Sequence, residues 1–565
     1  MISIRKIGVL GRTYRNLNRY RQILTILFKY GFGDMIEHLK IEQYIEIGLQ
    51  MISKKRRERI ERLTKAERAR MSLEELGPTY IKLGQILSIR PDLVPVDFIE
   101  ELSKLQDKAP EFSFSELTRI IAEEFGKPAE EVFEYLEEAP LASASIGQVH
   151  RARLKEGEEV AVKVQRPGIA KIIEVDLEIM LHLATLMERH IEELSLHRPV
   201  RIVEEFAKTI EKELNYTLEA NNMERMAHYA LNDKYIYIPK VFKDYTTRRV
   251  LTTEFIHGIK VSDLAQIERS GLNRKIICNR GADILLKQIF IHGFFHADPH
   301  PGNIFILPKN IICLIDFGMM GTIDRRSREE FVELVDSIVC KRTSRTVQVL
   351  LQITDREKET NIRKLERDVA EFIDLHLYKP LKEIEIGPLL NHMVELAARH
   401  RLRIPPELFI MLKALSTIEG VARLLNPNFD TIAKAKPFIR QIKTSRFGPQ
   451  RLGEDLWTLI TQLFEFANDF PKDLLEITRT LRQKKLTINL ELKGLETMLS
   501  THDQISNRIS FSIIIAALII GSALIVRSNT PPLFYGISMI GIIGFIAAAV
   551  MGIWLLVAIL KKGKL

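Results

Sequence analysis

The sequence predicts an α+β fold in which a strand-rich region lies between helical regions and is followed by two membrane spans. Residues 140–258 contain short extended runs separated by small-residue loops and turns, which is typical of strands. Residues 331–505 have apolar residues at three- and four-residue intervals, the period of helices packed on a core. Two long uncharged apolar runs near the C-terminus are long enough to cross a bilayer.

The composition is that of a globular protein with room for several domains. Its 565 residues are 46% hydrophobic and 27% charged, which allows two or three domains with sizeable cores. The net charge of +9 is modest for this length and does not require a nucleic-acid partner. Cys278, Cys313 and Cys340 are scattered without CxxC spacing, so neither a disulfide framework nor a structural zinc site is expected. This cysteine usage favours a reducing compartment.

The N-terminal region, residues 1–72, is basic and amphipathic. Residues 1–33 contain Lys and Arg but no Asp or Glu, and apolar residues such as Ile23 and Phe28 recur at helical spacing. This pattern favours an amphipathic helix on an anionic membrane surface, with an organellar transit peptide or a solvated basic helix as alternatives. No long apolar core with a cleavage site is present, which argues against a secretory signal peptide. A highly charged helical run is expected at 53–71.

A helical extension is expected at residues 73–139. Between residues 76 and 93, the isoleucines can share or adjoin one helix face, whereas Lys82 and Gln85 lie one turn apart on another. A lone lysine on such a helix is usually solvated, unless a partner lies elsewhere in the chain. Residues 113–139 are expected to form two further helices.

The strand region opens with a small-residue loop and continues with a strand that leads to a lysine. The loop is Ala142-Ser143-Ala144-Ser145, and the strand runs through Val160-Ala161-Val162 to Lys163. In protein kinases a hairpin covers the nucleotide phosphates in this position, and a following lysine reaches the phosphate oxygens. Here alanine and serine replace the usual glycines, so the backbone approaches phosphates less freely and nucleotide geometry or selectivity should differ.

An acidic helix is expected at residues 202–226, with Glu213 and Glu219 as its candidate functional residues. The two glutamates would lie about 600° apart around one helix, so they would not share a face. They could serve different lysines, Glu219 pairing with Lys163 and Glu213 pairing with Lys82. The alternative for either glutamate is a surface ion pair of little energetic consequence.

The strand at residues 249–258 is expected to end at a hinge beside the nucleotide. Backbone groups near Glu254 and Ile256 would then bind an adenine. A helix through residues 284–295 is expected to lead from this hinge region into the next motif.

Residues 296–303 read His-Ala-Asp-Pro-His-Pro-Gly-Asn, and after two apolar runs they are followed by Asp316-Phe317-Gly318. This order matches the phosphoryl-transfer machinery of protein kinases, in which carboxylates and an amide oxygen surround the reacting phosphate and its metal. Asp298 is the candidate base or orienter, and Lys163 is the second candidate catalytic residue. Asn303 and Asp316 are the candidate ligands of Mg²⁺ or Mn²⁺.

A metal-dependent hydrolase is an alternative for the same segment. His296, Asp298 and His300 alternate, so an extended backbone could present all three as ligands on one side. The two nearby prolines argue against a regular strand at this place.

Taken together, the motifs resemble the UbiB family of atypical kinase-like proteins, which is linked to ubiquinone and other isoprenoid-lipid pathways. The resemblance rests on Lys82-Leu83-Gly84-Gln85, on the 142–145 loop, on Lys163 with its two glutamates, and on the segments at 296–303 and 316–318. It implies a two-lobe kinase-like fold that binds ATP or ADP with a divalent metal. It also implies ATPase activity tied to lipids, rather than protein phosphorylation.

The resemblance further implies a regulatory set of residues. Lys82 and Gln85 would lie on a helix that folds over the active site and fills part of the groove for protein substrates, and Glu213 would help to hold Lys82. The family usually has Glu-x-Asp where this chain has Glu213-Leu214-Asn215, so Asn215 should engage a metal or lysine more weakly.

The expected domain order follows from the motifs. No Ala-Pro-Glu segment or long activation loop follows residue 318, so a peptide substrate would have little to dock on. The expected parts are a basic N-terminal region (1–72), a helical extension with the lysine motif (73–139), a kinase-like N-lobe (140–258), a C-lobe core (259–330), a helical subdomain (331–505) and a transmembrane hairpin (509–560).

The two apolar runs predict a membrane hairpin. The first extends from Ile509 to Val526 and the second from Leu533 to Leu560, each bounded by basic residues or proline. Basic residues at the outer ends place both termini of the hairpin on the cytoplasmic side. A stripe of small residues at positions 544, 548 and 552 could pack on the first span or on another protomer.

The expected function is that of a membrane-anchored atypical kinase or ATPase that serves ubiquinone or other isoprenoid-quinone synthesis. Its expected partners are membrane lipids, isoprenoid quinones or their precursors, and lipid-biosynthetic enzymes, with a homodimer through the spans as a further option. The expected location is a bacterial inner membrane, with the catalytic part in the cytoplasm. Besides the hydrolase, two alternatives remain. One is a kinase that acts on a protein, a small molecule or a lipid, and the other is a nucleotide-binding scaffold without turnover.

Overall fold

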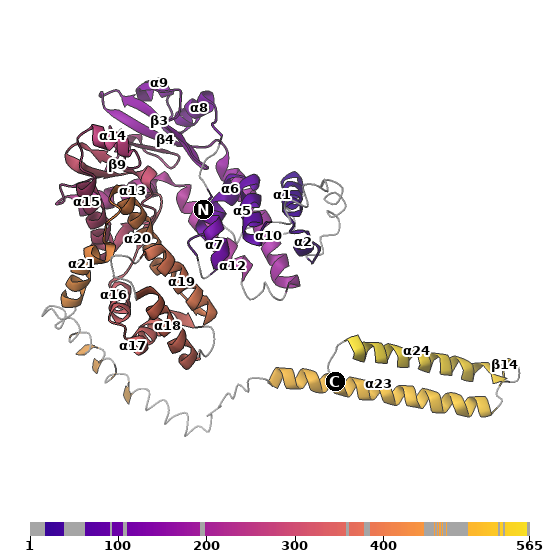
Figure 1. The fold of residues 1–565 in the computed structure, drawn as a ribbon. Helices are drawn as coiled ribbons and strands as arrows, with labels where there is room; N and C mark the ends of the chain where they lie inside the picture. Colours follow the sequence, from indigo (N-terminus) through magenta and orange to yellow (C-terminus); the bar gives the residue numbers. More distant parts are fainter. Residues whose placement is uncertain are drawn as a thin grey trace. The chain divides into compact units, whose positions relative to one another are not determined.

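The computed structural model divides the chain into two compact units, residues 1–452 and residues 453–565, and each unit is described here by itself. Figure 1 shows the elements of both units. The residues that the structure describes are 17–38, 63–90, 93–105, 110–191, 198–356, 361–377, 385–445, 495–528, 531–534 and 537–561, with separate residues between 457 and 471.

A five-stranded antiparallel sheet follows the helical extension. Its order is β1-β3-β4-β6, and β2 pairs with the beginning of β3. One face is covered by α8, through a buried cluster that includes Val160, Val162 and Val250. The elements are α8 (Phe114–Phe125), α9 (Ala129–Val132), β1 (Phe133–Leu136), β2 (Ala142–Ser143), β3 (Gly147–Leu154), β4 (Glu159–Gln165) and β6 (Val250–Glu254).

Three expected helices differ in the structure. The second helix expected at 113–139 is only the short α9, because Phe133 is buried and its segment pairs with β3 as a strand. The helix expected at 202–226 is two helices, because Asn215 caps the start of a new one. The helix expected at 284–295 ends early in a π-helical turn, and Gly293 at φ 65° lets the chain turn into a strand.

Four helices position the two candidate glutamates: α6, α10 and α12 pack on one another, and α13 contacts β6 of the sheet. The break between α12 and α13 puts Glu213 at the end of one helix and Glu219 in the first turn of the next. The helices are α6 (Pro78–Leu87), α10 (Ile169–His190), α12 (Pro199–Glu213) and α13 (Tyr216–Ala230).

A second region holds the segments at 296–303 and 316–318. A four-stranded sheet has the order β5-β10-β9-β7, and β8 pairs with β11 in a separate ladder. Its elements are β5 (Ile236–Tyr237), β7 (Ile259–Lys260), α14 (Leu264–Arg269), α15 (Arg274–Lys287), the π-helical turn Gln288–His292, β8 (Phe294–His296), β9 (Ile304–Leu307), β10 (Ile311–Leu314) and β11 (Met320–Thr322). Short 3-10 turns lie at Lys243–Tyr245, Pro301–Asn303 and Pro308–Asn310.

The helices after this region share its hydrophobic core. Buried residues of α15, such as Ile284, belong to the same cluster as buried residues of α20, such as Leu408 and Ile418. Among the described residues, the expectation of helices throughout this region is wrong where β12 and β13 form a small antiparallel ladder. The elements are α16 (Arg325–Val339), α17 (Thr343–Ile353), β12 (Asp355–Arg356), α18 (Ile362–Leu377), α19 (Ile386–Arg399), β13 (Leu402–Arg403), α20 (Pro406–Leu425) and α21 (Thr431–Ser445).

The N-terminal amphipathic helix does not have a free apolar face. In α1 (Leu17–Lys29), Ile23 and Phe28 are buried in a cluster shared with α10 and α12. Arg19 fixes the helix through a hydrogen bond of 2.7 Å to the fully buried Asp176 of α10. The expectation that this helix lies on a membrane is therefore wrong for residues 17–29, because tertiary packing already buries the face.

Parts of the basic N-terminal region have no structural description. Residues 1–16 and the charged run at 53–62 lie outside the described residues. Of the remaining N-terminal helices, α5 and α7 pack on α6, whereas α2 packs on α1. A capping box between Thr64 and Glu67 starts α5. These helices are α2 (Gly33–His38), α5 (Lys65–Leu76) and α7 (Val96–Leu102).

The second unit contains two long apolar helices. These are α23 (Leu495–Arg527) and α24 (Met539–Lys561), and both are long and apolar enough to cross a membrane by length and composition. Residues 533–538 do not belong to the second helix, because β14 (Leu533–Phe534) pairs with β15 (Ile537–Ser538). Most of the helix expected between 446 and 494, and the basic residues 562–565, lie outside the described residues.

Candidate functional site

Lys163 and Glu219 form an ion pair between β4 and α13. The Nζ atom lies 2.9 Å from Glu219 Oε2 and 3.1 Å from Oε1. Glu219 is only 7% exposed, and the lysine ammonium also lies over the ring of Tyr216, 5.2 Å from its centre. The pairing predicted from the sequence is therefore present, and the pair holds an ammonium against the inner face of the five-stranded sheet.

Asp316 lies beside this pair in an uncommon backbone conformation. Its φ is 62°, in the left-handed region that non-glycine residues seldom adopt, and its Oδ1 is 3.7 Å from Lys163 Nζ. Its side chain is 51% exposed, so the carboxylate faces open space as well as the lysine. Strained residues of this kind are concentrated at functional sites.

The charges in this cluster shift one another's pKa values. The ammonium of Lys163, with smaller contributions from Lys82 and His296, lowers the pKa of Asp316 to about 2. Burial raises the pKa of Glu219, although Lys163 opposes this effect. Burial lowers the pKa of Lys163, but the carboxylates of Asp316 and Glu219 outweigh it and raise the pKa well above its usual value. At neutral pH the site therefore presents a charged lysine and an ionised Asp316.

Asn222 fixes the segment that follows Asp316. Its Nδ2 donates a hydrogen bond of 3.0 Å to the carbonyl of Phe317. Asn222 lies three residues after Glu219 on α13, so one helix face positions both the lysine and the aspartate segment. Sequence reasoning missed this residue, although the i, i+3 spacing from Glu219 could have indicated it.

The segment 296–303 is bonded to the end of the strand that leads to Asp316. The N–H of Asp298 donates to His296 Nδ1 at 3.2 Å, and the backbone N–H of Ile315 donates to the carbonyl of Asn303 at 3.0 Å. Asp298 is exposed, whereas His296 is buried. The loop therefore ties the candidate metal ligand Asn303 to the strand that leads to Asp316, and it leaves the Asp298 carboxylate facing outward. The assignment of Asn303 and Asp316 as metal ligands and of Asp298 as base stays a prediction.

The alternative metal site of His296, Asp298 and His300 does not form. His296 accepts from the Asp298 N–H, and its Nε2 faces the carbonyl of Ile315 at 3.3 Å. The Nδ1 of His300 accepts from the N–H of Gly302 at 3.0 Å. Among the residues that the structure describes, no group of three or more His, Cys, Asp or Glu side chains converges on a possible metal position. The hydrolase hypothesis therefore lacks its ligand set, because the prolines turn the chain instead of extending it.

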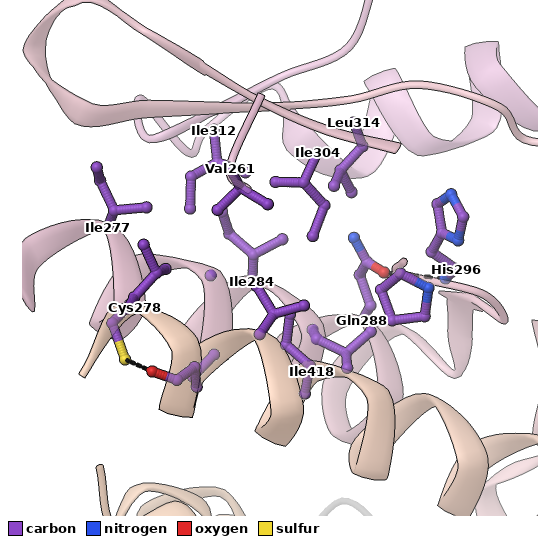
Figure 2. A pocket seen from close by; sticks show the side chains of 17 residues that line it. Val261, Ile277, Cys278, Ile284, Gln288, His296, Ile304, Ile312, Leu314 and Ile418 are labelled. Atoms are coloured by element: carbon purple, nitrogen blue, oxygen red, sulfur yellow. Dashed lines mark hydrogen bonds between the residues drawn. The ribbon is translucent and has the colours of Figure 1, made fainter. Parts of the chain in front are cut away.

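A small cavity lies beneath this loop, between α15, α20 and the four-stranded sheet. Figure 2 shows that its walls are almost entirely apolar, with Gln288 and His296 at one end. Its volume of about 30 Å³ is sufficient for one or two waters and too small for an adenine or a quinone ring. Gln288 Nε2 is buried there without a hydrogen-bond partner among the described residues, while its Oε1 accepts from the His296 N–H.

An arginine that follows β4 fixes the small-residue loop by hydrogen bonds. The Nε of Arg166 donates to the carbonyl of Ala144 at 3.0 Å, and its Nη2 donates to Ser143 Oγ at 2.9 Å. Ala142 and Ser143 form β2, and Ser145 is fully buried. The loop is therefore fixed next to β4, and the predicted contact of residues 142–145 with phosphates stays a prediction. Sequence reasoning missed Arg166, because it follows the strand that ends at Gln165 and carries no motif of its own.

The expected hinge lies at the end of β6. The N–H of Glu254 donates to the carbonyl of Lys240 at 2.9 Å, and the N–H of Phe255 donates to the carbonyl of Glu159 at 3.0 Å. The Glu254 carboxylate accepts from Tyr237. These internal bonds use two of the hinge N–H groups, so an adenine contact would fall to the Glu254 carbonyl and the Ile256 N–H.

The helix that carries Lys82 reaches the same cluster. Lys82 Nζ is 2.9 Å from Glu213 Oε2, and both side chains are largely buried, with 12% and 13% exposed. Lys82 is close enough to Asp316 to lower the pKa of that carboxylate. The predicted pairing of Glu213 with Lys82 is therefore present, and the α6 helix lies beside the candidate metal ligand. Gln85 is further away, and its Nε2 donates to the carbonyl of Leu105 at 3.4 Å.

Asn215 has a structural task in this region. Its Oδ1 accepts from the N–H of Thr217 at 3.2 Å and from the Thr217 hydroxyl at 2.7 Å, which caps α13. An aspartate could form the same cap, so the replacement preserves the helix start. The predicted weaker engagement of a metal or lysine by Asn215 is untested.

Comparison with known proteins supports the same assignment. Residues 104–350 match the ABC1 atypical kinase-like domain, residues 369–430 the UbiB helical domain, and residues 493–561 the ABC1/UbiB kinase-like C-terminal domain. An uncharacterised protein from the hydrogenase 1 5′ region of Clostridium pasteurianum is 32% identical over 97% of this chain and 99% of its own. The probable protein kinase UbiB of Aeromonas hydrophila is 36% identical over 75% of this chain and 78% of its own.

Solved structures show a more distant likeness. A Mycobacterium tuberculosis protein solved in complex with erythromycin covers 63% of this chain and 90% of its own, with 24% identity and a TM-score of 0.45. The family matches and the relatives, together with the ion pair of Lys163 and Glu219 beside Asp316, confirm the resemblance predicted from the motifs and give the chain an atypical kinase-like fold. The chain belongs to the ABC1/UbiB family of atypical kinase-like proteins.

Proposed function

We propose that this chain binds ATP or ADP with Mg²⁺ and hydrolyses ATP in support of ubiquinone or other isoprenoid-quinone synthesis. The observation that supports this most is the cluster of Lys163, Glu219 and Asp316, next to the loop with Asp298 and Asn303. Phosphoryl transfer depends mainly on positioning and on charge stabilisation, and these residue types provide both. The Lys163 ammonium would bind phosphate oxygens, and Asn303 with Asp316 would hold the metal.

Water is the acceptor that the surroundings favour. After Gly318 the chain forms β11 at 320–322 and then α16 from Arg325, so no long segment is available to dock a peptide. By the family resemblance, the α6 helix with Lys82 would fill part of the groove for a protein substrate, and Lys82 pairs with Glu213 next to the proposed site. Hydrolysis, or transfer to a small or lipid-borne acceptor, requires a smaller substrate-binding groove than transfer to a peptide does.

We propose that Lys82 restrains the site through its pairs. The Lys82 ammonium pairs with Glu213 and also acts on the charge of Asp316. Loss of the lysine side chain would therefore leave the Glu213 carboxylate unpaired and open space next to the proposed metal position. Lys82→Ala should change the preference between nucleotides or permit autophosphorylation. Identical nucleotide affinities and identical labelling in the variant and the parent protein would contradict this role.

The membrane part of the proposal rests on α23 and α24. Two long apolar helices of this kind favour a hairpin anchor in a bacterial inner membrane, with both ends in the cytoplasm and the catalytic part on that side. This location would place ATP turnover beside quinones, their precursors and the enzymes that modify them. Another copy of the chain could also pack on the hairpin.

The test follows the terminal phosphate of labelled ATP, with full-length protein in anionic liposomes and Mg²⁺. Release of inorganic phosphate that is lost in Asp316→Asn would support an ATPase. Label on a protein or lipid would instead identify a kinase, and nucleotide binding without turnover under any lipid condition would identify a scaffold. Turnover unchanged in Asp316→Asn would refute the assignment of the site.

A further inference from the structure

Lys413 reaches the catalytic region from the helical subdomain. It projects from the middle of α20, and its Nζ donates a hydrogen bond of 3.2 Å to Ser88 Oγ. Ser88 is 2% exposed, and its hydroxyl donates to the carbonyl of Gln85 at the end of α6. A lysine that lies 325 positions away along the chain is thus held against the helix that carries Lys82.

In the part of the chain that the structure describes, the ammonium of Lys413 is bonded to a hydroxyl and not to a carboxylate. Among the described residues, no carboxylate oxygen lies within 4.0 Å of its Nζ, and the hydroxyl of Ser88 is its hydrogen-bond partner. Burial lowers the pKa of Lys413, and the carboxylate of Asp298 acts in the opposite direction. Lys413 is half-buried, and an ammonium partly removed from water without a paired anion is costly, unless an anion from outside the chain completes its surroundings.

The position of Lys413 relative to the other groups indicates which anion. In the proposed site, Lys163 and Asp316 lie where the inner phosphates and the metal are expected, and Asp298 is the proposed base beside the terminal phosphate. The loop from 296 to 303 itself contains no Lys or Arg. A cation beside this loop must therefore come from elsewhere in the fold, and α20 passes next to the loop, since Pro299 and Ile418 of α20 line the same cavity. The charge of Asp298 also acts on the pKa of Lys413.

We propose that Lys413 binds the terminal phosphate of the nucleoside triphosphate, so that the helical subdomain completes the nucleotide site. The inference rests on the proposed function and adds a residue from outside the kinase-like region. Lys163 would then hold the phosphates from the sheet side, and Lys413 would hold the transferred group from the helical side. ADP lacks this phosphate, so Lys413 would distinguish the triphosphate from the diphosphate.

The test compares affinities for Mg²⁺-AMPPNP and Mg²⁺-ADP by equilibrium titration of the full-length protein in liposomes. Lys413→Gln keeps a donor for Ser88 but removes the charge, and it should weaken triphosphate binding about tenfold or more while ADP binding stays constant. Ser88→Ala removes the hydrogen bond but keeps the charge, and it should preserve the ratio of the two affinities. Lys413→Met offers a second uncharged variant of similar length, so the comparison does not depend on the folding of one protein.

Two results separate the possible failures. If the parent protein binds both nucleotides and the uncharged variants lose both equally or neither, Lys413 has only a structural role and the inference is refuted while the proposed function stands. If the parent protein binds neither nucleotide, the proposed function and the inference are refuted together.

Discussion

Replacing Asn222 by alanine should weaken Mg²⁺-dependent nucleotide binding without abolishing nucleotide binding itself. The Asn222 side chain donates to the Phe317 carbonyl at 3.0 Å, directly after the positive-φ residue Asp316. The bond therefore helps to keep the Asp316 carboxylate in its present orientation, toward Lys163 and the proposed metal position. Alanine removes the donor and leaves the other contacts of α13 in place.

The size of the effect follows from two opposing energies. A hydrogen bond of this kind contributes about 1 kcal/mol, and a left-handed conformation at a non-glycine residue costs about 1–2 kcal/mol. Without the bond, the observed conformation loses about 1 kcal/mol relative to relaxed alternatives, which corresponds to about a fivefold change in their ratio. Since apparent affinity scales with the fraction of competent protein, Mg²⁺-dependent affinity should fall by up to about fivefold.

The assay is a titration of nucleotide into full-length protein, once with Mg²⁺ and once with a chelator. Asn221→Ala is the matched control, because Asn221 is exposed on the same helix and the substitution has the same effect on helix propensity. The control should bind as the parent protein does under both conditions. Equal losses with and without Mg²⁺ in Asn222→Ala, or no loss at all, would show that this bond does not set the orientation of Asp316.

Three further predictions concern charge, pH and the hairpin. Glu219→Gln should lower ATP affinity about tenfold in a binding titration, because Lys163 loses a buried charged partner; unchanged affinity would contradict this. The pKa of Asp316 is about 2, so its carboxylate is lost only as the pH falls through that value. The Asp316 carboxyl should therefore stay ionised between neutral pH and about pH 4 when its own titration is followed by NMR, and titration of this carboxyl near pH 6 would oppose the assignment. Gly544→Leu should destabilise the hairpin by about 1–3 kcal/mol in detergent melting, because a Cβ at this position would lie 2.1 Å from the hydroxyl oxygen of Ser522 in α23. Gly552→Leu should leave the melting unchanged, because a Cβ there would have no atom within 4 Å.

The short motifs predicted several residues of the candidate site from the sequence alone. The strand that leads to Lys163, the acidic residue Glu219 and the triplet at Asp316 were recognisable because kinase-like sequences carry these residue types in a fixed order along the chain. The pairing of Lys82 with Glu213 was also predicted from the family resemblance. Their contacts still depend on packing between distant segments, because the two ion pairs join α6 with α12 and β4 with α13.

Local helix boundaries were predicted less well, since they depend on partners distant in sequence. Phe133 ended a predicted helix because β3 offered it a strand partner, and tertiary pairing outweighs weak helix propensity. Asn215 divided a predicted helix because its side chain caps a new one. The apolar side of α1 had the period of a membrane-surface helix, but a period does not say which apolar partner covers it.

The sequence by itself determined the family, the order of the motifs and the two apolar helices at the C-terminus, because each is written in contiguous residues. Only the tertiary structure decided which distant side chains meet those motifs. Arg166 holds the small-residue loop, Asn222 holds the segment after Asp316, and Lys413 arrives from a helix far along the chain. Only Asn222 has a local hint, its i, i+3 spacing from Glu219. Arg166 and Lys413 have none, because their roles arise from chain segments that lie far apart in the sequence and that packing brings together.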